Sequence, residues 1–147
     1  MSAERISLDT NILFYAVDRD SGTRHERAQE LIKESALHQD CLVILQVLGE
    51  FFTAVTRKKR MTHEEAQAQV QDWQILFTIT SATPTTLQKA MQAVKQHRLS
   101  FWDAMIWAVA REAGVTRLFS EDFQHNRVLD GVRFVNPFLV KNPFGET

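Results

Sequence analysis

Residues 5–17 read Arg-Ile-Ser-Leu-Asp-Thr-Asn-Ile-Leu-Phe-Tyr-Ala-Val, and the rest of the chain is best interpreted from this stretch. Ile6 and Leu8 alternate with polar residues as in a short strand, and the apolar residues that follow recur with helical spacing. Asp9 lies where the strand ends and the helix begins. One interpretation is a simple helix N-cap, for which Asp is a preferred residue. The other is a functional site, because open α/β sheets bind ligands outside the carboxyl ends of their strands.

The composition is that of an ordinary globular protein. The chain has 147 residues, a formal net charge of −1 and one cysteine. This length fits a single domain, residues 1–147. A net charge near zero excludes a polyanion-binding field over the whole surface, so a nucleic acid would need a local basic patch. Because the chain shows no signal-peptide core, no bilayer-spanning stretch and no possible internal disulfide, we expect a cytoplasmic protein without membrane association.

Strand and helix patterns alternate along the chain without a Pro- or Gly-rich linker. We expect helices at about 10–17, 23–37, 46–58, 63–76, 84–97 and 101–113, and short strands at about 6–8, 41–44, 77–80, 116–120 and 132–135. Thr23 with Glu26, and Thr62 with Glu65, have the spacing of a capping box. This alternation predicts an α/β fold with a mainly parallel sheet.

Four acidic side chains hold comparable places in this pattern. Asp9 ends the first strand and Asp122 follows a later one, whereas Glu50 and Asp103 lie near the starts of their helices. A parallel sheet would bring all four to one rim. Structural explanations remain open, because Glu50 shares a polar helix face and Asp122 could be a turn residue.

Asp103 is the hardest of the four to explain without a function. Its neighbours at helical spacing are apolar, so it lies on a buried face unless it acts as a second cap with Ser100. Two carboxylates 5 Å apart repel by roughly 3 kcal/mol at an effective dielectric near 20, so four together need protons or a cation. An all-oxygen ligand set favours Mg²⁺ or Mn²⁺ over zinc. Such a site suits the attack of water on a phosphodiester.

Four segments of the chain resemble, in order and spacing, the four motifs of the PIN-domain ribonucleases. They are Leu8–Leu13, Gln46–Phe51, Ser100–Ile106 and Phe119–Phe123. More narrowly, they are similar to the VapC-type toxins of type II toxin–antitoxin systems. The resemblance spans nearly the whole chain. It implies a three-layer PIN-like α/β fold, in which helices flank a central and mainly parallel sheet.

The resemblance also implies a function: a Mg²⁺- or Mn²⁺-dependent endoribonuclease that hydrolyses RNA with a metal-activated water. The acidic, catalytic cluster would be Asp9, Glu50, Asp103 and Asp122. Asp9 and Asp103 would be the most direct metal ligands, and Glu121 is an alternative to Asp122. Supporting positions would be Thr10, Asn11 and Ser120. The expected partners are the RNA substrate, a small cognate antitoxin and a second copy in a homodimer.

Basic groups must lie near an acidic site that binds RNA, because carboxylates repel phosphates. Four consecutive residues close the helix that carries Glu50: Arg57, Lys58, Lys59 and Arg60. They could form a phosphate track or a dock for an acidic antitoxin segment, or they could simply favour the helix C-terminus. Trp102 and Trp107 are expected in the core rather than as platforms for base stacking, because the helix around them is apolar.

Two other interpretations compete with the nuclease. A non-catalytic PIN-like module that binds RNA or protein would also fit a near-zero net charge and one short basic cluster. A phosphatase or receiver domain is a weaker candidate. Asp9-Thr10-Asn11 lacks the Asp-x-Asp of the phosphatases, no acidic pair precedes Asp9, and there is no Gly-rich phosphate loop.

Overall fold

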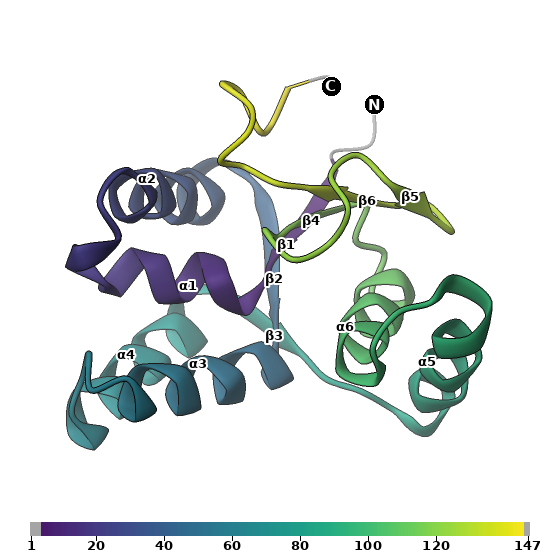
Figure 1. Ribbon diagram of the computed structural model, residues 1–147, viewed down its shortest axis with the longest axis horizontal. Helices are drawn as coiled ribbons and strands as arrows, with labels where there is room; N and C mark the ends of the chain where they lie inside the picture. The colour runs from purple at the N-terminus through teal and green to yellow at the C-terminus, as the bar shows by residue number, and fades with distance from the viewer. Residues whose placement is uncertain (1–3, 146–147) are drawn as a thin grey trace.

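The computed structural model describes residues 4–145, which form one mixed α/β arrangement (Figure 1). The elements in chain order are β1 (Arg5–Leu8), α1 (Thr10–Val17), a 3₁₀ turn η1 (Arg19–Ser21), α2 (Thr23–His38), β2 (Asp40–Ile44), α3 (Leu45–Arg57), α4 (His63–Leu76), β3 (Thr78–Thr80), α5 (Pro84–His97), α6 (Phe101–Glu112), β4 (Arg117–Phe119), β5 (Val128–Leu129) and β6 (Val132–Val135). The predicted helices are confirmed to within a few residues at their ends. The expected α/β class is also confirmed.

The sheet has the strand order β3-β2-β1-β4-β6-β5, and every pairing is parallel except β5 with β6. The chain builds outward from β1 through β2 to β3, and then places β4 on the opposite side of β1. The order therefore reverses between β1 and β4. In open α/β sheets the ligand crevice lies outside the carboxyl ends of the strands at such a reversal.

Helices cover both faces of the sheet, as Figure 1 shows with α1 to α4 on one side and α5 and α6 on the other. This is the expected three-layer arrangement. In α6 every residue from Ala104 to Ala110 is buried, because the sheet and α5 enclose the helix. Large side chains such as Phe51, Phe119 and Phe134 are fully buried between the layers. Burial of each contributes about 1.5–3 kcal/mol to folding.

Two local predictions differ from the structure. The capping box is present at Thr62 and Glu65, but Thr23 is already helical and Gly22, with φ 62°, is the N-cap of α2. The capping box would make Thr23 the residue before the first helical one, whereas the chain enters α2 from the η1 turn through Gly22, so Thr23 is itself the first helical residue. Strand β5 was not expected, although Asp130-Gly131 is a strong two-residue hairpin signal. Both turn residues have positive φ, and they pair Leu129 with Val132.

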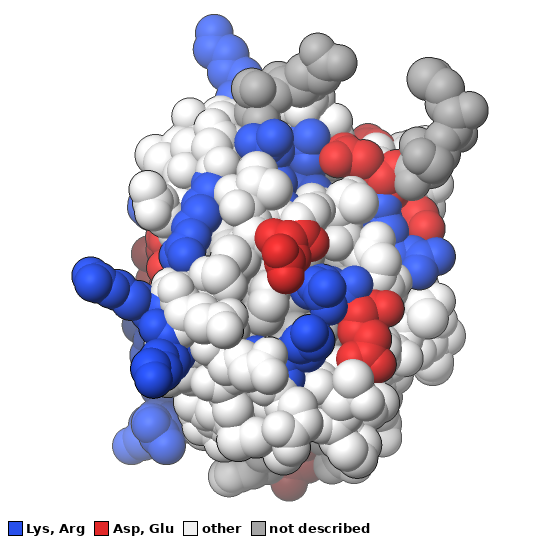
Figure 2. Space-filling model, turned by 90° about the vertical axis from the view of Figure 1, so that its right-hand side faces the viewer, with Lys and Arg blue, Asp and Glu red and all other residues white. Residues whose placement is uncertain are grey.

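The surface carries no large field of one sign on the side of α5 and α6. Figure 2 shows that face as mostly uncharged, with basic and acidic side chains interspersed. This distribution agrees with the net charge of −1. Within residues 4–145, no helix has the length and apolar character needed to cross a membrane.

Candidate active site

A pocket of about 690 Å³ opens between α1, α3 and α6 at the carboxyl edge of the sheet. It is lined by Asp9, Thr10, Gln46, Gly49, Glu50, Thr53, Ala54, Arg57, Lys58, Trp102, Asp103 and Asp122. All four of the predicted acids are among these residues. The fold therefore brings together carboxylates that are up to 113 positions apart in the sequence (from 9 to 122).

Asp9 lies at the innermost position, where the strand order reverses. It is 3% exposed, and its backbone N–H donates to Phe119 O at 2.9 Å. Its side chain is the N-cap of α1, accepting from Thr10 N at 2.7 Å, and it also accepts from Ser120 Oγ at 2.6 Å. Asp9 is thus the helix cap that the first interpretation expects, and it also lines the pocket, as a site residue would.

The pKa of Asp9 is raised to about 7, chiefly by burial and to a smaller extent by the nearby carboxylates of Asp122 and Glu50, whereas the hydrogen bonds from Ser120 and Thr10 lower it. Among the described residues, none of the groups that shift this pKa is a cation. A carboxylate in these surroundings favours its protonated form unless positive charge is brought to it. The Asp9 carboxylate is therefore suited to binding a cation.

Glu50 is held in place by two side chains, not simply solvated on a polar face. Thr10 Oγ1 donates to Glu50 Oε1 at 2.8 Å, and Gln46 Nε2 donates to Glu50 Oε2 at 3.1 Å. The same Gln46 amide also donates to Trp102 O at 3.2 Å. Gln46 therefore connects the first turn of α3 to the first turn of α6 across the mouth of the pocket.

Asp103 enters the pocket from the first turn of α6. Ser100 caps this helix, with Asp103 N donating to Ser100 Oγ at 3.4 Å. Asp103 is partly buried, and burial is the largest effect that raises the pKa of its carboxyl. The carboxylates of Asp122 and Glu50 raise this pKa further, so all four acids interact electrostatically.

The expectation that both tryptophans of this segment are core residues is wrong for Trp102. Trp107 is 2% exposed and donates from Nε1 to Leu129 O, whereas Trp102 is 60% exposed and lines the pocket. The two residues lie on the same apolar helix. The first turn of α6 extends beyond the packed layers, and the sequence pattern gave no sign of this.

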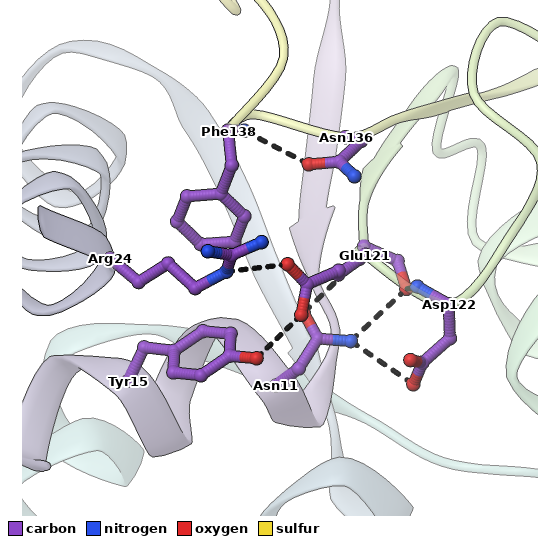
Figure 3. Close-up of polar contacts among 8 residues, drawn as sticks. Asn11, Tyr15, Arg24, Glu121, Asp122, Asn136 and Phe138 are labelled. Atoms are coloured by element: carbon purple, nitrogen blue, oxygen red, sulfur yellow. Dashed lines mark hydrogen bonds and ion pairs between the residues drawn. The ribbon is translucent and has the colours of Figure 1, made fainter. Parts of the chain in front are cut away.

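The structure separates Glu121 from Asp122, as Figure 3 shows. Glu121 points away from the pocket and accepts from the Tyr15 hydroxyl and from Arg24 Nε, the latter at 2.6 Å. Asp122 lines the pocket and accepts from Asn11 Nδ2 at 3.1 Å. The carboxylate of Asp122, and not that of Glu121, therefore faces the other acids.

Asn11 and Ser120 hold the segment that carries Asp122. Asn11 Oδ1 accepts from the backbone N–H of Glu121 at 3.2 Å, and Ser120 Oγ accepts from the backbone N–H of Asp122 at 3.0 Å. Because Ser120 Oγ also donates to Asp9, this hydroxyl links the first acid to the last. Thr10, Asn11 and Ser120 therefore each donate a hydrogen bond to a carboxylate of the pocket.

The basic cluster is divided between two surfaces. Arg57 and Lys58 line the pocket, with Lys58 Nζ 4.6 Å from the centre of the Phe14 ring. Lys59 has φ 56°, which turns the chain, and Arg60 pairs with Asp18 and Asp20 on a different hollow. Of the four basic residues expected near RNA, the structure brings two to the acidic pocket.

The carboxylates do not form a preassembled metal site. Within residues 4–145, no three His, Cys, Asp or Glu side chains lie close enough together to hold a metal ion. The four acids nevertheless share one pocket, and the Glu50 and Asp122 carboxylates contribute to the raised pKa of both Asp9 and Asp103. Their oxygen-only donor set matches Mg²⁺ or Mn²⁺. The residues therefore fit such an ion in the chemistry of their donor atoms.

The comparisons with known proteins define the class. Residues 6–130 match the model of the PIN domain, and the chain belongs to this family. No curated protein sequence matches the chain at a significant level.

Several solved structures share the fold. VapC20 of Mycobacterium tuberculosis, described as a toxin that cleaves the sarcin–ricin loop, is 24% identical, with a TM-score of 0.66 over 87% of this chain and 98% of its own. A DNA-bound VapBC2 structure from Rickettsia felis is 15% identical, with a TM-score of 0.65 over 88% and 96%. A toxin–antitoxin complex from Klebsiella pneumoniae is 18% identical, with a TM-score of 0.65 over 90% and 97%. At these identities the similarity establishes a common fold.

Proposed function

We propose that this chain is a single-domain, Mg²⁺- or Mn²⁺-dependent endoribonuclease that hydrolyses RNA phosphodiesters. The observation that carries the proposal is the pocket in which Asp9, Glu50, Asp103 and Asp122 meet. A buried Asp9 with a pKa raised to about 7 is poised to exchange its proton for a cation. Membership of the PIN domain family supports a nuclease at the family level.

Asp9 and Asp103 would hold the ion most directly, with Glu50 and Asp122 completing its surroundings. When bound, such an ion supplies positive charge that offsets the negative charge developing at the scissile phosphate. The chain's own residues fix the acids. Ser120 and the Thr10 backbone orient the Asp9 carboxylate, and the Thr10 hydroxyl orients Glu50.

Substrate binding needs positive charge to offset the acids, and Arg57 and Lys58 supply it on the same pocket. These two residues would contact a phosphate that flanks the cleaved one. Lys59 and Arg60 would contribute less, since Arg60 is already paired with Asp18 and Asp20. Binding should therefore weaken steeply with salt even though the net charge is −1.

The biological setting we propose is that of a cytoplasmic toxin, held inactive by a small antitoxin and assembled as a homodimer. Support comes from the fold shared with VapC20, a sarcin–ricin loop cleaving toxin, and with toxins solved as antitoxin complexes. Structured RNA is accordingly the first substrate class to test.

The decisive experiment incubates the purified chain with structured RNA and Mn²⁺, with and without EDTA. We expect cleavage that EDTA abolishes, and loss of cleavage in Asp103→Asn with its thermal unfolding preserved. A non-catalytic PIN-like module is the second candidate, favoured by the absence of a preassembled metal cluster within residues 4–145. RNA binding without any chelator-sensitive cleavage would select that module and overturn the nuclease.

A further inference from the structure

Trp102 is the one tryptophan of three that lies on the surface. It is 60% exposed, whereas Trp73 is 5% and Trp107 is 2% exposed. Its ring packs edge-on with Phe101 at 4.8 Å between centroids, and its backbone is held by Gln46. An indole this exposed lacks much of the stabilisation that burial of an apolar side chain contributes. Its place on the wall of the acidic pocket indicates a ligand.

Gly49 leaves an opening in the same wall. It lies inside α3, where glycine is destabilising relative to alanine. Neither backbone nor packing requires it, because its φ is not positive and an added Cβ would meet nothing within 4 Å. The missing side chain therefore widens the pocket between Gln46 and Glu50.

The chemical character of the residues that line the pocket changes along α3. Residues on one side of this helix, from Gln46 to Arg57, line it, a length of about 16 Å at 1.5 Å per residue. Gln46, which bonds to the Trp102 backbone, lies at one end, Glu50 lies in between, and Arg57 lies at the other end. Along this side of α3, a contact to the Trp102 segment, an acid and a cation thus follow one another, and we call this series the track.

We infer that Trp102, beside the opening at Gly49, is a stacking subsite for an unpaired nucleobase adjacent to the scissile phosphate. The inference rests on the proposed function. A single strand presents bases and phosphates in alternation, which matches the order of indole, acids and cations. Base stacking on an aromatic ring tolerates any base, so this subsite selects unpaired RNA over a duplex. A loop or bulge is therefore the substrate feature that it recognises.

An apolar side chain of a protein partner is the alternative occupant of the indole. The track favours RNA, because the indole lies on the same pocket as the acids and as Arg57 and Lys58. A lone apolar contact would make no use of these charged groups. The two occupants are separated by the measurements below.

The test uses the intrinsic fluorescence of the full chain in EDTA, so that RNA binds without being cleaved. The probes are a ten-nucleotide oligoadenylate and a ten-unit abasic ribose-phosphate strand. We expect oligoadenylate to quench the emission of Trp102, since stacked bases quench indoles, and the abasic strand to leave it unchanged. Trp102→Phe should remove the quench and keep most of the affinity.

Affinity for oligoadenylate, measured by fluorescence anisotropy, should fall about 5- to 100-fold in Trp102→Ala, the range expected for one stacked base. Gly49→Leu, which fills the opening, should weaken binding similarly while its circular dichroism and thermal unfolding remain those of a folded protein. Ile75→Ala is the matched control, because Ile75 is 86% exposed on α4 and does not line the pocket. It should bind like the parent.

The inference would be overturned if saturating oligoadenylate did not quench the fluorescence of the parent, or if Trp102→Ala bound it as tightly as the parent does. Either result would favour a protein partner as the occupant of the indole surface. Failure of Trp102→Phe to restore affinity would overturn stacking as well. In each case, EDTA-sensitive cleavage by the parent would still stand, so the subsite would fail alone. Absence of that cleavage would overturn the proposed function.

Discussion

Helix α1 has a buried aspartate at each end, and the two carboxylates are in opposite electrostatic situations. Asp9, the N-cap, is 3% exposed and has a pKa raised to about 7, chiefly by burial. Asp18, the C-cap, is 7% exposed and has its pKa lowered, chiefly by the hydrogen bond from the Ser21 hydroxyl. The pKa of each carboxyl therefore reflects its depth in the protein together with its hydrogen bonds and charged neighbours.

The difference lies in what surrounds each carboxylate. Asp18 accepts from Ser21 Oγ at 2.7 Å and from Asp20 N at 3.2 Å, and Arg60 Nε lies 3.6 Å away. Asp9 also accepts two hydrogen bonds, but the charged groups nearest to it are other acids. A buried charge that the protein compensates is structural, whereas one that it leaves uncompensated indicates a site for an external cation.

The largest effect expected from this comparison is on catalysis. Asp9→Asn should lower metal-dependent RNA cleavage by more than about 100-fold, because we propose Asp9 as a direct metal ligand, and loss of a ligand exceeds the loss of a residue that only orients one. Asp18→Asn removes a carboxylate at the other end of the same helix and should keep cleavage within about 2-fold of the parent. Initial rates in Mn²⁺ measure both. Equal losses in the two variants would abolish the distinction between the two aspartates.

The second effect is on stability as a function of pH in EDTA. The pKa of Asp9 is raised from 3.8 to about 7 on folding, so the folded state binds the proton more tightly than the unfolded chain. Its stabilising contribution is full below pH 3.8 and is lost as the pH rises to about 7, on the order of 4 kcal/mol. Urea unfolding should therefore give the parent a lower free energy of unfolding at pH 8 than at pH 5. Asp9→Asn should lack this part of the pH dependence.

Adding Mg²⁺ at pH 8 should restore stability to the parent more than to Asp9→Asn, because the ion binds the ionised carboxylate. A parent whose stability relative to Asp9→Asn is independent of both pH and Mg²⁺ would contradict this account of Asp9.

The smallest effects concern how Asp18 is held. Asp18→Asn should lower the free energy of unfolding at pH 7 by about 1–3 kcal/mol, since donors aimed at a charge lose their partner. Arg60→Gln should cost less than about 1 kcal/mol, because the Arg60 side chain is 40% exposed and its ion pairs are screened. The opposite ranking, measured by urea unfolding, would make the ion pair and not the hydrogen bonds the main support of Asp18.

Much of the fold was predictable because its signals are local. Thr83-Pro84 marks the start of α5, and the Thr62–Glu65 capping box marks the start of α4. The Asp130-Gly131 turn also gives a local signal, although the two-residue strand before it was not expected. The expected cap at Thr23 was wrong, because the η1 turn displaces the start of α2.

The candidate site was predictable in outline and not in detail. The placement of Asp9 at the end of β1 follows from an alternating pattern that changes to a helical one. The exposure of Trp102 does not follow from any such pattern, since its neighbours at helical spacing, Met105 and Ile106, are apolar and buried. Periodicity cannot identify the turn of a buried helix that extends beyond the core.

The sequence by itself determined where the strands and helices lie and which acids follow them, because these depend on residues a few positions apart. Only the tertiary structure decided that Asp122 faces the pocket and Glu121 does not, since Glu121 is held by Tyr15, 106 positions away. The tertiary structure likewise places Arg57 and Lys58 on the pocket that the acids line, and pairs Arg60 with Asp18. Such choices depend on contacts between distant segments, which exist only once the sheet has brought those segments together.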